Sequence, residues 1–214
     1  MINYQGTSLY RGIPIDFVDR SNWIAVVGAR KADREELNAA YQLAYKIAST
    51  GRVVVSGLAL GIDTVAHQAV VDAKGKTIAI VNTPSSQPIY PKQNRILAQD
   101  IQTCGGIIFP YSSKAVEAEK KGISHFSKRL IERDLLLAHL CPTIVTVKTG
   151  NTTITGGTKW SFNEGAKVGK KLFLYDTQGT FHSSPSYEER KIHWNMEMNI
   201  NQIIKNLEEL SFCS

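Results

Sequence analysis

The chain has 214 residues, of which 43% are hydrophobic and 21% are charged. These proportions exclude a disordered tail and a membrane-embedded bundle, and the length suits one full domain with a small appendage. An excess of 25 Lys and Arg over 19 Asp and Glu gives a formal charge of +6, which favours a polyanionic partner.

The sequence carries no apolar run long enough for a signal peptide or a membrane span, so we expect a cytoplasmic protein with no membrane partner. Its three cysteines, Cys104, Cys141 and Cys213, are far apart and odd in number. That spacing argues against a disulfide framework or a zinc cluster and suits a reducing compartment. We expect no metal and no other cofactor.

From residue 23 onward, short apolar runs alternate with segments whose apolar residues recur at helical spacing. The runs predict strands at 23–28, 52–57, 77–82, 105–110, 143–148 and 171–176. The periodic segments predict helices at 33–50, 62–74, 92–103, 125–140 and 159–168. Strands that alternate with helices pair in parallel, so we predict an α/β fold with a doubly wound, mostly parallel sheet flanked by helices.

Two segments fall outside this alternation. Residues 1–20 are expected to form a leader segment on a domain that spans 21–182, and 183–214 a helical tail with a helix over 187–210. The apolar stripe of that helix fits docking on the parent domain or a subunit interface. The segment 111–124, which is rich in lysine and glutamate, is expected to be a mobile, solvated loop.

In a doubly wound sheet, ligands bind at the carboxyl ends of the strands, so the residues that follow each strand are the candidates for a site. The first group is Gly28, Ala29 and Arg30. Gly28 lets the chain pass close to a ligand, and the planar guanidinium of Arg30 offers a fork of donors suited to phosphate.

The second group lies between a buried strand and a helix and comprises Ser56, Gly57, Leu58 and Gly61. Its glycines free backbone N–H groups to face an anion at a helix amino terminus. Asp63 and His67 follow, four residues apart and therefore on one helix face. Since no nucleophile accompanies them, a structural hydrogen bond that shapes the loop is favoured over acid–base catalysis.

The third group is Gly156, Gly157 and Thr158, a glycine-rich turn with a hydroxyl that could bind phosphate or cap the next helix. None of the three groups matches GxGxxG or GxxxxGK[ST], and no acidic residue follows the second strand at the ribose-binding position. NAD-dependent and P-loop chemistries are therefore disfavoured.

The segments VVGAR, VVVSGLALGIDTVAHQAVVDAKGKTIAIV, IYPKQNRILAQDI, ERDLLLAHLCPTIVTV and GGTKWSFNEGAKVGKKLF together resemble the DprA/Smf family of DNA-processing proteins. The resemblance covers residues 22–176 and keeps the family's motif order. It implies an extended Rossmann-like domain that binds single-stranded DNA, loads a RecA-type recombinase on it and works as a dimer in natural transformation. We therefore expect a homodimer or a higher homo-oligomer.

Within that resemblance, Arg30 matches the arginine of the family's GSR motif and would contact phosphate. Gly57, Gly61, Asp63 and His67 match the SGxARGID and AH positions, Arg133 and Asp134 begin the RNR motif, and Gly156, Gly157 and Thr158 stand where the family has SGS. The chain departs from the pattern at three positions, namely Leu60 and Leu135, which replace arginines, and Lys148, which stands near a usual glutamate. We expect Arg129, Arg133 and Lys148 to complete the DNA- or nucleotide-binding residues.

Three functions remain open. The first is a non-catalytic, DprA-like protein that binds single-stranded DNA in DNA processing and recombination. The second is a sensor or sponge for a small nucleotide-derived signal, because the altered ARGID motif has lost a cation. The third is a LOG-like nucleotide phosphoribohydrolase, for which Arg129 is available but the first carboxylate after the Gly-Gly-Thr turn, Glu164, comes nearly a helical turn too late.

Overall fold

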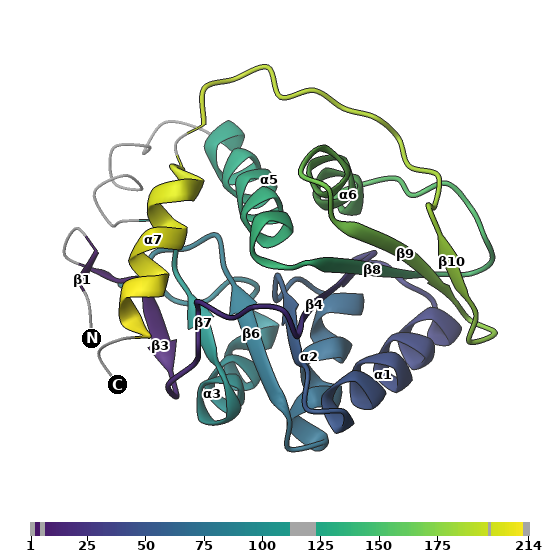
Figure 1. The fold of residues 1–214 in the computed structure, drawn as a ribbon, viewed down its shortest axis with the longest axis horizontal. Coiled ribbons are helices and arrows are strands. Elements are labelled where there is room, and N and C mark those ends of the chain that lie inside the picture. The colour runs from purple at the N-terminus through teal and green to yellow at the C-terminus, as the bar shows by residue number, and fades with distance from the viewer. Residues whose placement is uncertain (1–2, 5–6, 112–122, 197, 212–214) are drawn as a thin grey trace.

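The computed structural model describes residues 3–4, 7–111, 123–196 and 198–211 and confirms the predicted doubly wound α/β fold (Figure 1). Its main sheet has eight strands in the order β10-β9-β8-β4-β5-β6-β7-β3. The strands from β9 to β7 in this order pair in parallel, whereas β10 and β3 add antiparallel edges. The sheet strands are β3 (Tyr10–Gly12), β4 (Trp23–Gly28), β5 (Val53–Ser56), β6 (Lys76–Ile80), β7 (Gly106–Ile108), β8 (Thr143–Lys148), β9 (Lys171–Asp176) and β10 (Phe181–Ser183).

Helices cover both faces of the sheet, which buries the strands and explains why they read as continuous apolar runs. In Figure 1, α1, α2 and α3 lie on one face and α5, α6 and α7 on the other. The helices are α1 (Arg34–Ser49), α2 (Ile62–Asp72), α3 (Arg95–Cys104), α5 (Ile123–Leu140), α6 (Thr158–Lys167) and α7 (Ile200–Leu210), with a 3-10 turn η1 (Lys92–Asn94) before α3. A separate two-stranded ribbon pairs β1 (Asn3–Tyr4) with β2 (Thr7–Ser8).

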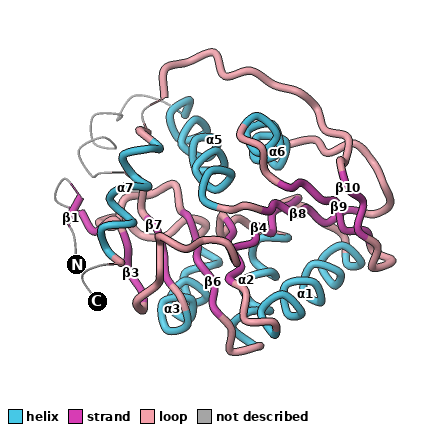
Figure 2. Tube along the Cα trace, in the orientation of Figure 1, coloured by secondary structure: helices cyan, strands magenta, loops and turns pink. Residues whose placement is uncertain are grey.

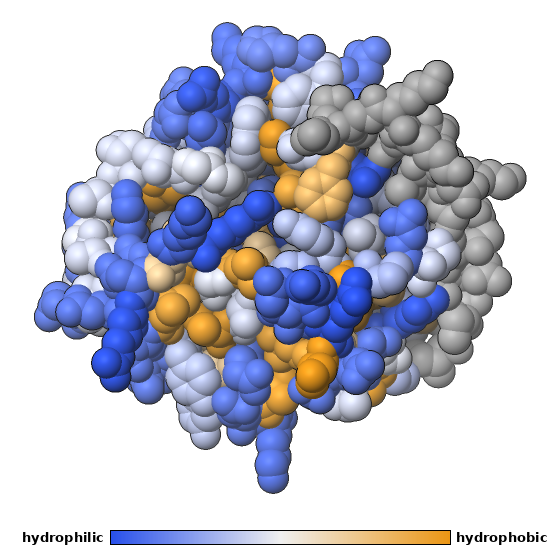
Figure 3. All heavy atoms as spheres, turned by 180° about the vertical axis from the view of Figure 1, so that it is seen from behind, coloured by the Kyte–Doolittle hydropathy of each residue, from blue (hydrophilic) through white to orange (hydrophobic). Residues whose placement is uncertain are grey.

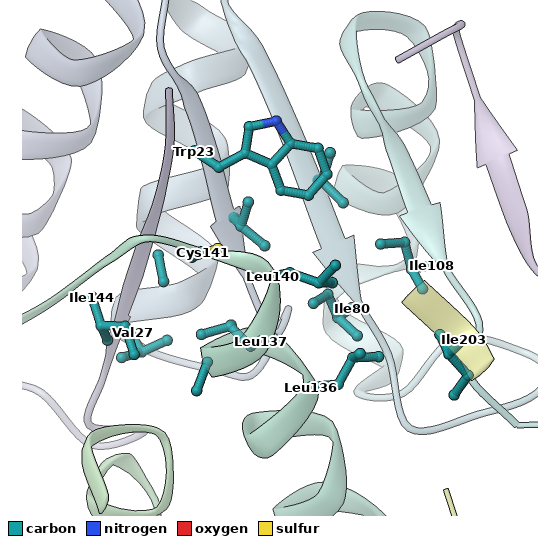
Figure 4. Packing of buried hydrophobic residues seen from close by; sticks show 14 of the residues in the cluster. Trp23, Val27, Ile80, Ile108, Leu136, Leu137, Leu140, Cys141, Ile144 and Ile203 are labelled. Carbon is teal, nitrogen blue, oxygen red and sulfur yellow. The ribbon is translucent and has the colours of Figure 1, made fainter. Parts of the chain in front are cut away.

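The main core lies between the sheet and the helices α5 and α7. Figure 4 shows Leu136, Leu137 and Leu140 of α5 pointing toward Val27 and Ile80 of the sheet. On the opposite face, the small residues of α1 and α2 allow these two helices to pack closely on β4 and β5. The first turn of α1 is fixed by a capping box, in which the N–H of Glu36 donates to the carboxylate of Asp33 and the N–H of Asp33 donates to that of Glu36.

Both terminal segments are integrated into the domain. Part of the expected leader forms β3, which pairs with β7 and extends the sheet. The expected helix over 187–210 is wrong in its first half, because helix α7 begins at Ile200. The described residues before it, 184–196 and 198–199, are not helical, and residues 184–196 are hereafter the strap. Figure 2 shows the strap as a loop that passes from β10 over α6 and α5 to α7.

The expectation of a mobile loop over 111–124 falls mostly on residues 112–122, which lie outside the described part of the chain. Among the described helices, none combines the length and the apolar character that crossing a bilayer requires.

Helix α7 docks on its own domain, as one of the two readings of its apolar stripe predicts. Ile203 and Leu207 are buried in the main core. Arg20 and Glu208 form an ion pair of 3.0 Å at the rim of this contact, and the N–H of Phe17 donates to the hydroxyl of Ser211 at 2.7 Å. The tail therefore contributes to the same core as the sheet.

Because Leu207 is fully buried, Leu207→Ala should leave a cavity and lower the free energy of unfolding by about 2–5 kcal/mol. Lys205→Ala on the exposed side of α7 is the matched control and should change it by less than about 0.5 kcal/mol. Urea denaturation measures both. Equal stability of the two variants would mean that α7 does not pack on the core.

Candidate functional site

The chain reverses its direction of progress across the sheet at β4. From β4 it continues through β5, β6 and β7 on one side, then returns to place β8 on the other. At such a switch point the connections leave in opposite directions and open a crevice at the carboxyl ends of the strands. Gly28 at the end of β4 lies level with Val147 of β8, and a cavity of about 490 Å³ opens at this point, hereafter the switch-point cavity.

The switch-point cavity brings together members of all three loops that the sequence singles out. The expected site residues that line it are Gly28, Ala29, Arg30, Asp63, Arg133, Gly156, Gly157 and Thr158. Gly57 lies next to them and lines a smaller cavity of about 60 Å³ together with Arg30 and Arg133. The second and third loops and helix α5 are far apart in sequence, and only the parallel sheet makes them neighbours.

Arg133 occupies the space that Gly57 leaves free. A Cβ atom at position 57 would lie 1.4 Å from Nη1 of Arg133, so any side chain there would displace the guanidinium. Arg133 is buried, and its Nη1 donates to the carbonyl of Ile80 at 3.3 Å. Its Nε lies 2.9 Å from a carboxylate oxygen of Asp134, and its Nη1 lies 4.0 Å from Asp63. These two carboxylates provide the compensating charge that a buried guanidinium requires.

Asp63 shapes the second loop, in line with the structural role favoured for it. Its carboxylate accepts the N–H groups of Gly57 at 3.2 Å and Ala59 at 3.3 Å, on either side of Leu58. Leu58 is fully buried with a φ of 56°, a conformation that costs a leucine about 1–3 kcal/mol and persists only where its surroundings enforce it. The side chain of Asn94 adds a bond to the carbonyl of Leu58 at 2.9 Å. Burial raises the pKa of Asp63 against the opposing effects of Arg133 and these N–H groups.

His67 is engaged elsewhere. Its Nδ1 lies 2.7 Å from the hydroxyl of Thr77, which itself donates to the carbonyl of Val54 at 2.8 Å, so we assign the ring proton to Nδ1. Burial, with a smaller contribution from Arg133, lowers the pKa of His67 to about 3. A buried imidazole that stays neutral at physiological pH does not serve as a general acid, and His67 does not line the switch-point cavity.

Five further expected residues make contacts within the domain and lie outside the lining of the switch-point cavity. Ser56 donates to the carbonyl of Val26 at 2.6 Å inside the sheet, and Leu58 belongs to the core around α3. Arg129 donates to the carbonyl of Asn82 at 3.1 Å, and Lys148 donates to the carbonyl of Thr153 at 2.7 Å. Gly61 packs on the first loop, since a Cβ there would lie 2.2 Å from the carbonyl oxygen of Ala29.

The amino terminus of α6 faces the cavity. The helix begins at Thr158 with Gly157 as its N-cap, so the expectation that Thr158 caps a helix starting at residue 159 is wrong by one position. Among the described residues, no side chain forms a capping hydrogen bond at this end. The first N–H groups of a helix lack acceptors within the helix and carry its positive dipole end, so this terminus suits an anion.

The cavity lining includes residues that were not among the expected site residues, and Asp134 and Trp160 are the charged and the aromatic one of these. Burial raises the pKa of Asp134 to about 6, and Asp63 adds to that effect while Arg133 and Arg30 oppose it. Asp134 follows Arg133 in the RNR-like motif, and Trp160 lies two residues beyond the Gly-Gly-Thr turn. Their proximity in sequence was the available signal for both.

The carboxylate considered for phosphoribohydrolase chemistry points elsewhere. Glu164 pairs with Nε2 of His139 at 2.8 Å and with Lys167 at 3.7 Å, and it lines a different hollow on α6. The charged residues that do line the switch-point cavity are Arg30, Arg133, Asp63 and Asp134, whose formal charges cancel at neutral pH.

Gly61 and Gly157 make a matched test of the loop geometry. Gly61 has a φ of 81° and no room for a Cβ, so Gly61→Ala should lower the free energy of unfolding by about 1–3 kcal/mol. Gly157 is helical, with φ −67° and ψ −37°, and no atom lies within 4 Å of an added Cβ. Gly157→Ala should therefore leave stability unchanged or raise it slightly. Thermal unfolding that ranks the two variants in the opposite order would contradict this geometry.

A second test uses the pH dependence of stability. A carboxyl whose pKa rises on folding binds protons more tightly in the folded state, so its contribution is greatest below about pH 4 and is lost as the pH rises through about 6. Asp134→Asn should therefore be more stable than the parent at pH 8, by up to about 3 kcal/mol for a shift of about two units. The difference should shrink toward pH 4 in urea titrations. A difference that is independent of pH would show that Asp134 has an ordinary pKa.

The family model for DNA recombination-mediator protein A matches residues 7–208. Among curated proteins, the DNA processing protein DprA of Bacillus subtilis is 40% identical over 75 residues, which are 35% of this chain and 25% of that protein. The aligned regions in it and in the Synechocystis Smf protein thus span only about a quarter of the length of these relatives.

Solved structures agree in fold. DprA from Helicobacter pylori superposes with a TM-score of 0.65 at 22% identity and covers 94% of this chain and 86% of that one. DprA from Streptococcus pneumoniae superposes with a TM-score of 0.62 at 23% sequence identity, and the match covers 92% of this chain and 60% of that one. Since the family model spans β3 through α7, the chain belongs to the DprA/Smf family of DNA-processing proteins.

Proposed function

We propose that this chain is a non-catalytic DNA-processing protein that binds single-stranded DNA at the switch-point cavity. The observation that carries the proposal is that Arg30 and the uncapped amino terminus of α6 line one cavity. Arg30 is exposed, so its guanidinium is available to a phosphate, and the helix terminus adds N–H donors. Family membership supports the assignment, as does the related H. pylori protein, which is described by its single-stranded DNA binding mode.

Aromatic side chains beside the cavity offer surfaces for bases. Tyr90 and Phe126 meet edge to face with their ring centroids 4.9 Å apart, and Tyr90 is 46% exposed rather than packed in the core. Tyr90 lines the small cavity that also contains Arg30. Seen from behind, the molecule carries hydrophobic atoms near the middle of its face, between hydrophilic groups (Figure 3). Stacking on an exposed ring next to a phosphate contact is the usual way to hold a single strand without reading its sequence.

The same proposal includes two properties expected from the family. The chain would assemble as a homodimer, and a RecA-type recombinase would be its partner. Both rest on family membership alone.

The charge balance in the cavity favours a second candidate. The charge of Arg133 is compensated by Asp134 and Asp63. Among the charged residues that line the cavity, Arg30 is therefore the one whose guanidinium can attract a phosphate. A small nucleotide-derived signal, with one or two phosphates, would need no further cations. This candidate makes the protein a sensor or sponge with the same cavity.

Arg30→Ala separates these functions from a purely structural role of the cavity. The variant should bind oligothymidylate more weakly by about 1–3 kcal/mol, because it loses a charge-assisted hydrogen bond to phosphate. Arg52→Ala is the matched control, since Arg52 is also exposed but precedes β5, at the opposite end of the strands. Fluorescence anisotropy across a salt series measures both, and binding by the parent should weaken as salt rises.

Undetectable or salt-insensitive binding of oligothymidylate by the parent protein would contradict the DNA proposal. If a mononucleotide or cyclic nucleotide then raised the melting temperature of the parent but not of Arg30→Ala, the second candidate would stand instead.

A further inference from the structure

A second hollow, of about 550 Å³, adjoins the switch-point cavity. It lies between α5, α6 and the strap, and is hereafter the strap groove. Its lining residues are Leu135, Trp160, Asn163, Glu164, Lys167, Glu189, Arg190, Lys191 and Ile192. Figure 1 shows the strap crossing over both helices on its way to α7.

Helix α6 connects the two hollows. Its first turn lines the switch-point cavity, and the residues 160, 163, 164 and 167, which recur at helical spacing along one face, line the strap groove. Trp160 belongs to both linings, so the hollows meet at its ring. From Thr158 to Lys167 the helix rises about 14 Å, which gives an extended ligand a track from one hollow into the other.

The strap is tied to α6 by specific bonds, so the groove has a defined wall. The side-chain amide of Asn163 donates to the carbonyl of Glu188 at 2.9 Å and accepts the N–H of Arg190 at 3.1 Å. Lys159 forms an ion pair of 2.9 Å with Glu188. Further along, Trp194 packs edge to face on Trp160 with centroids 6.1 Å apart.

The cations of the groove outnumber its carboxylates. The lining holds Lys167, Arg190 and Lys191 against Glu164 and Glu189, a formal balance of +1, whereas the lining of the switch-point cavity is neutral. Arg190 is also paired with Glu188, so Lys167 and Lys191 are the cations of the groove that remain for a ligand. Glu164 is also held by His139 at 2.8 Å. The side chain of Lys167 is 74% exposed and Lys191 is exposed, so both ammonium groups can turn toward a ligand. An aromatic ring at the junction and cations beyond it suit a phosphodiester chain with a base stacked on Trp160.

We propose that the strap groove is a second subsite for the same nucleic-acid strand, and that single-stranded DNA passes from the switch-point cavity over Trp160 to Lys167 and Lys191. This inference rests on the proposed function, because it extends that site. It assigns to the strap a role in forming the binding path. The occupant is a single strand rather than a mononucleotide, because the track is longer than one nucleotide unit.

The test compares a thymidine dinucleotide, which is too short to reach from the switch-point cavity along α6 to Lys167, with an oligothymidylate of about 16 nucleotides, at the upper end of the site sizes of single-stranded DNA-binding folds. The double variant Lys167→Ala/Lys191→Ala should bind the long oligonucleotide several-fold more weakly and the short one normally. The slope of log affinity against log salt for the long one should fall by about 1.4, for two lost phosphate contacts. The matched control is the double variant Lys46→Ala/Lys205→Ala, which removes two exposed lysines on α1 and α7. It should bind the short and the long oligonucleotide with the affinities of the parent protein.

The outcomes separate the two proposals. If Arg30→Ala weakens both lengths while the double variant matches the parent with both, the proposed function stands and the strap groove is not a subsite. If the double variant weakens the short oligonucleotide as much as the long one, the assigned order of subsites is wrong. If Arg30→Ala and the double variant both leave binding unchanged, both proposals fail.

Discussion

The buried guanidinium of Arg133 is the constraint on which the candidate site depends. It lies where Gly57 has no side chain, between Asp134 of its own helix and Asp63 of α2, and it bonds to the carbonyl of Ile80 in the sheet. Removing the guanidinium would leave Asp63 and Asp134 buried without their compensating cation, and breaking a buried ion pair in this way costs about 3–5 kcal/mol. Helix α5 and the second loop are therefore fixed relative to each other by charge as well as by apolar packing.

This arrangement changes what the net charge of +6 implies. Arg133 contributes to structure, Arg129 is engaged by Asn82, and Lys148 by Thr153, so three cations expected to face a ligand are already bonded within the domain. In the proposed function, a polyanion at the switch point would be attracted by Arg30 and by the dipole of α6 instead. Further cations lie along the strap groove, and this distribution is the reason for proposing a path along α6 rather than one compact basic pocket.

Much of this could be predicted from the sequence. The six parallel strands and the helices between them follow from apolar periodicity, whereas the short antiparallel edge strands β3 and β10 were not predicted. The meeting of Gly28, Asp63 and Gly156 follows from the rule that ligands bind at the carboxyl ends of parallel strands. The strap could not be predicted as non-helical, because Ile192 and Met196 continue the helical spacing of α7 while the chain is tied to Asn163 by its backbone. The contacts of His67 and Arg129 could not be predicted either, because their partners Thr77 and Asn82 lie 10 and 47 residues away in sequence and meet them only in the folded chain.

The most direct test of this account is a crystal structure of the protein with a bound oligothymidylate. The account predicts one phosphate within hydrogen-bond distance of both Arg30 and the first N–H groups of α6, with Arg133 still paired to Asp134 and the strand continuing past Trp160. An oligonucleotide bound away from the switch-point cavity would contradict it. So would a bound strand that draws Arg133 away from Asp134 to reach a phosphate, because the structural role assigned to that guanidinium would then be wrong.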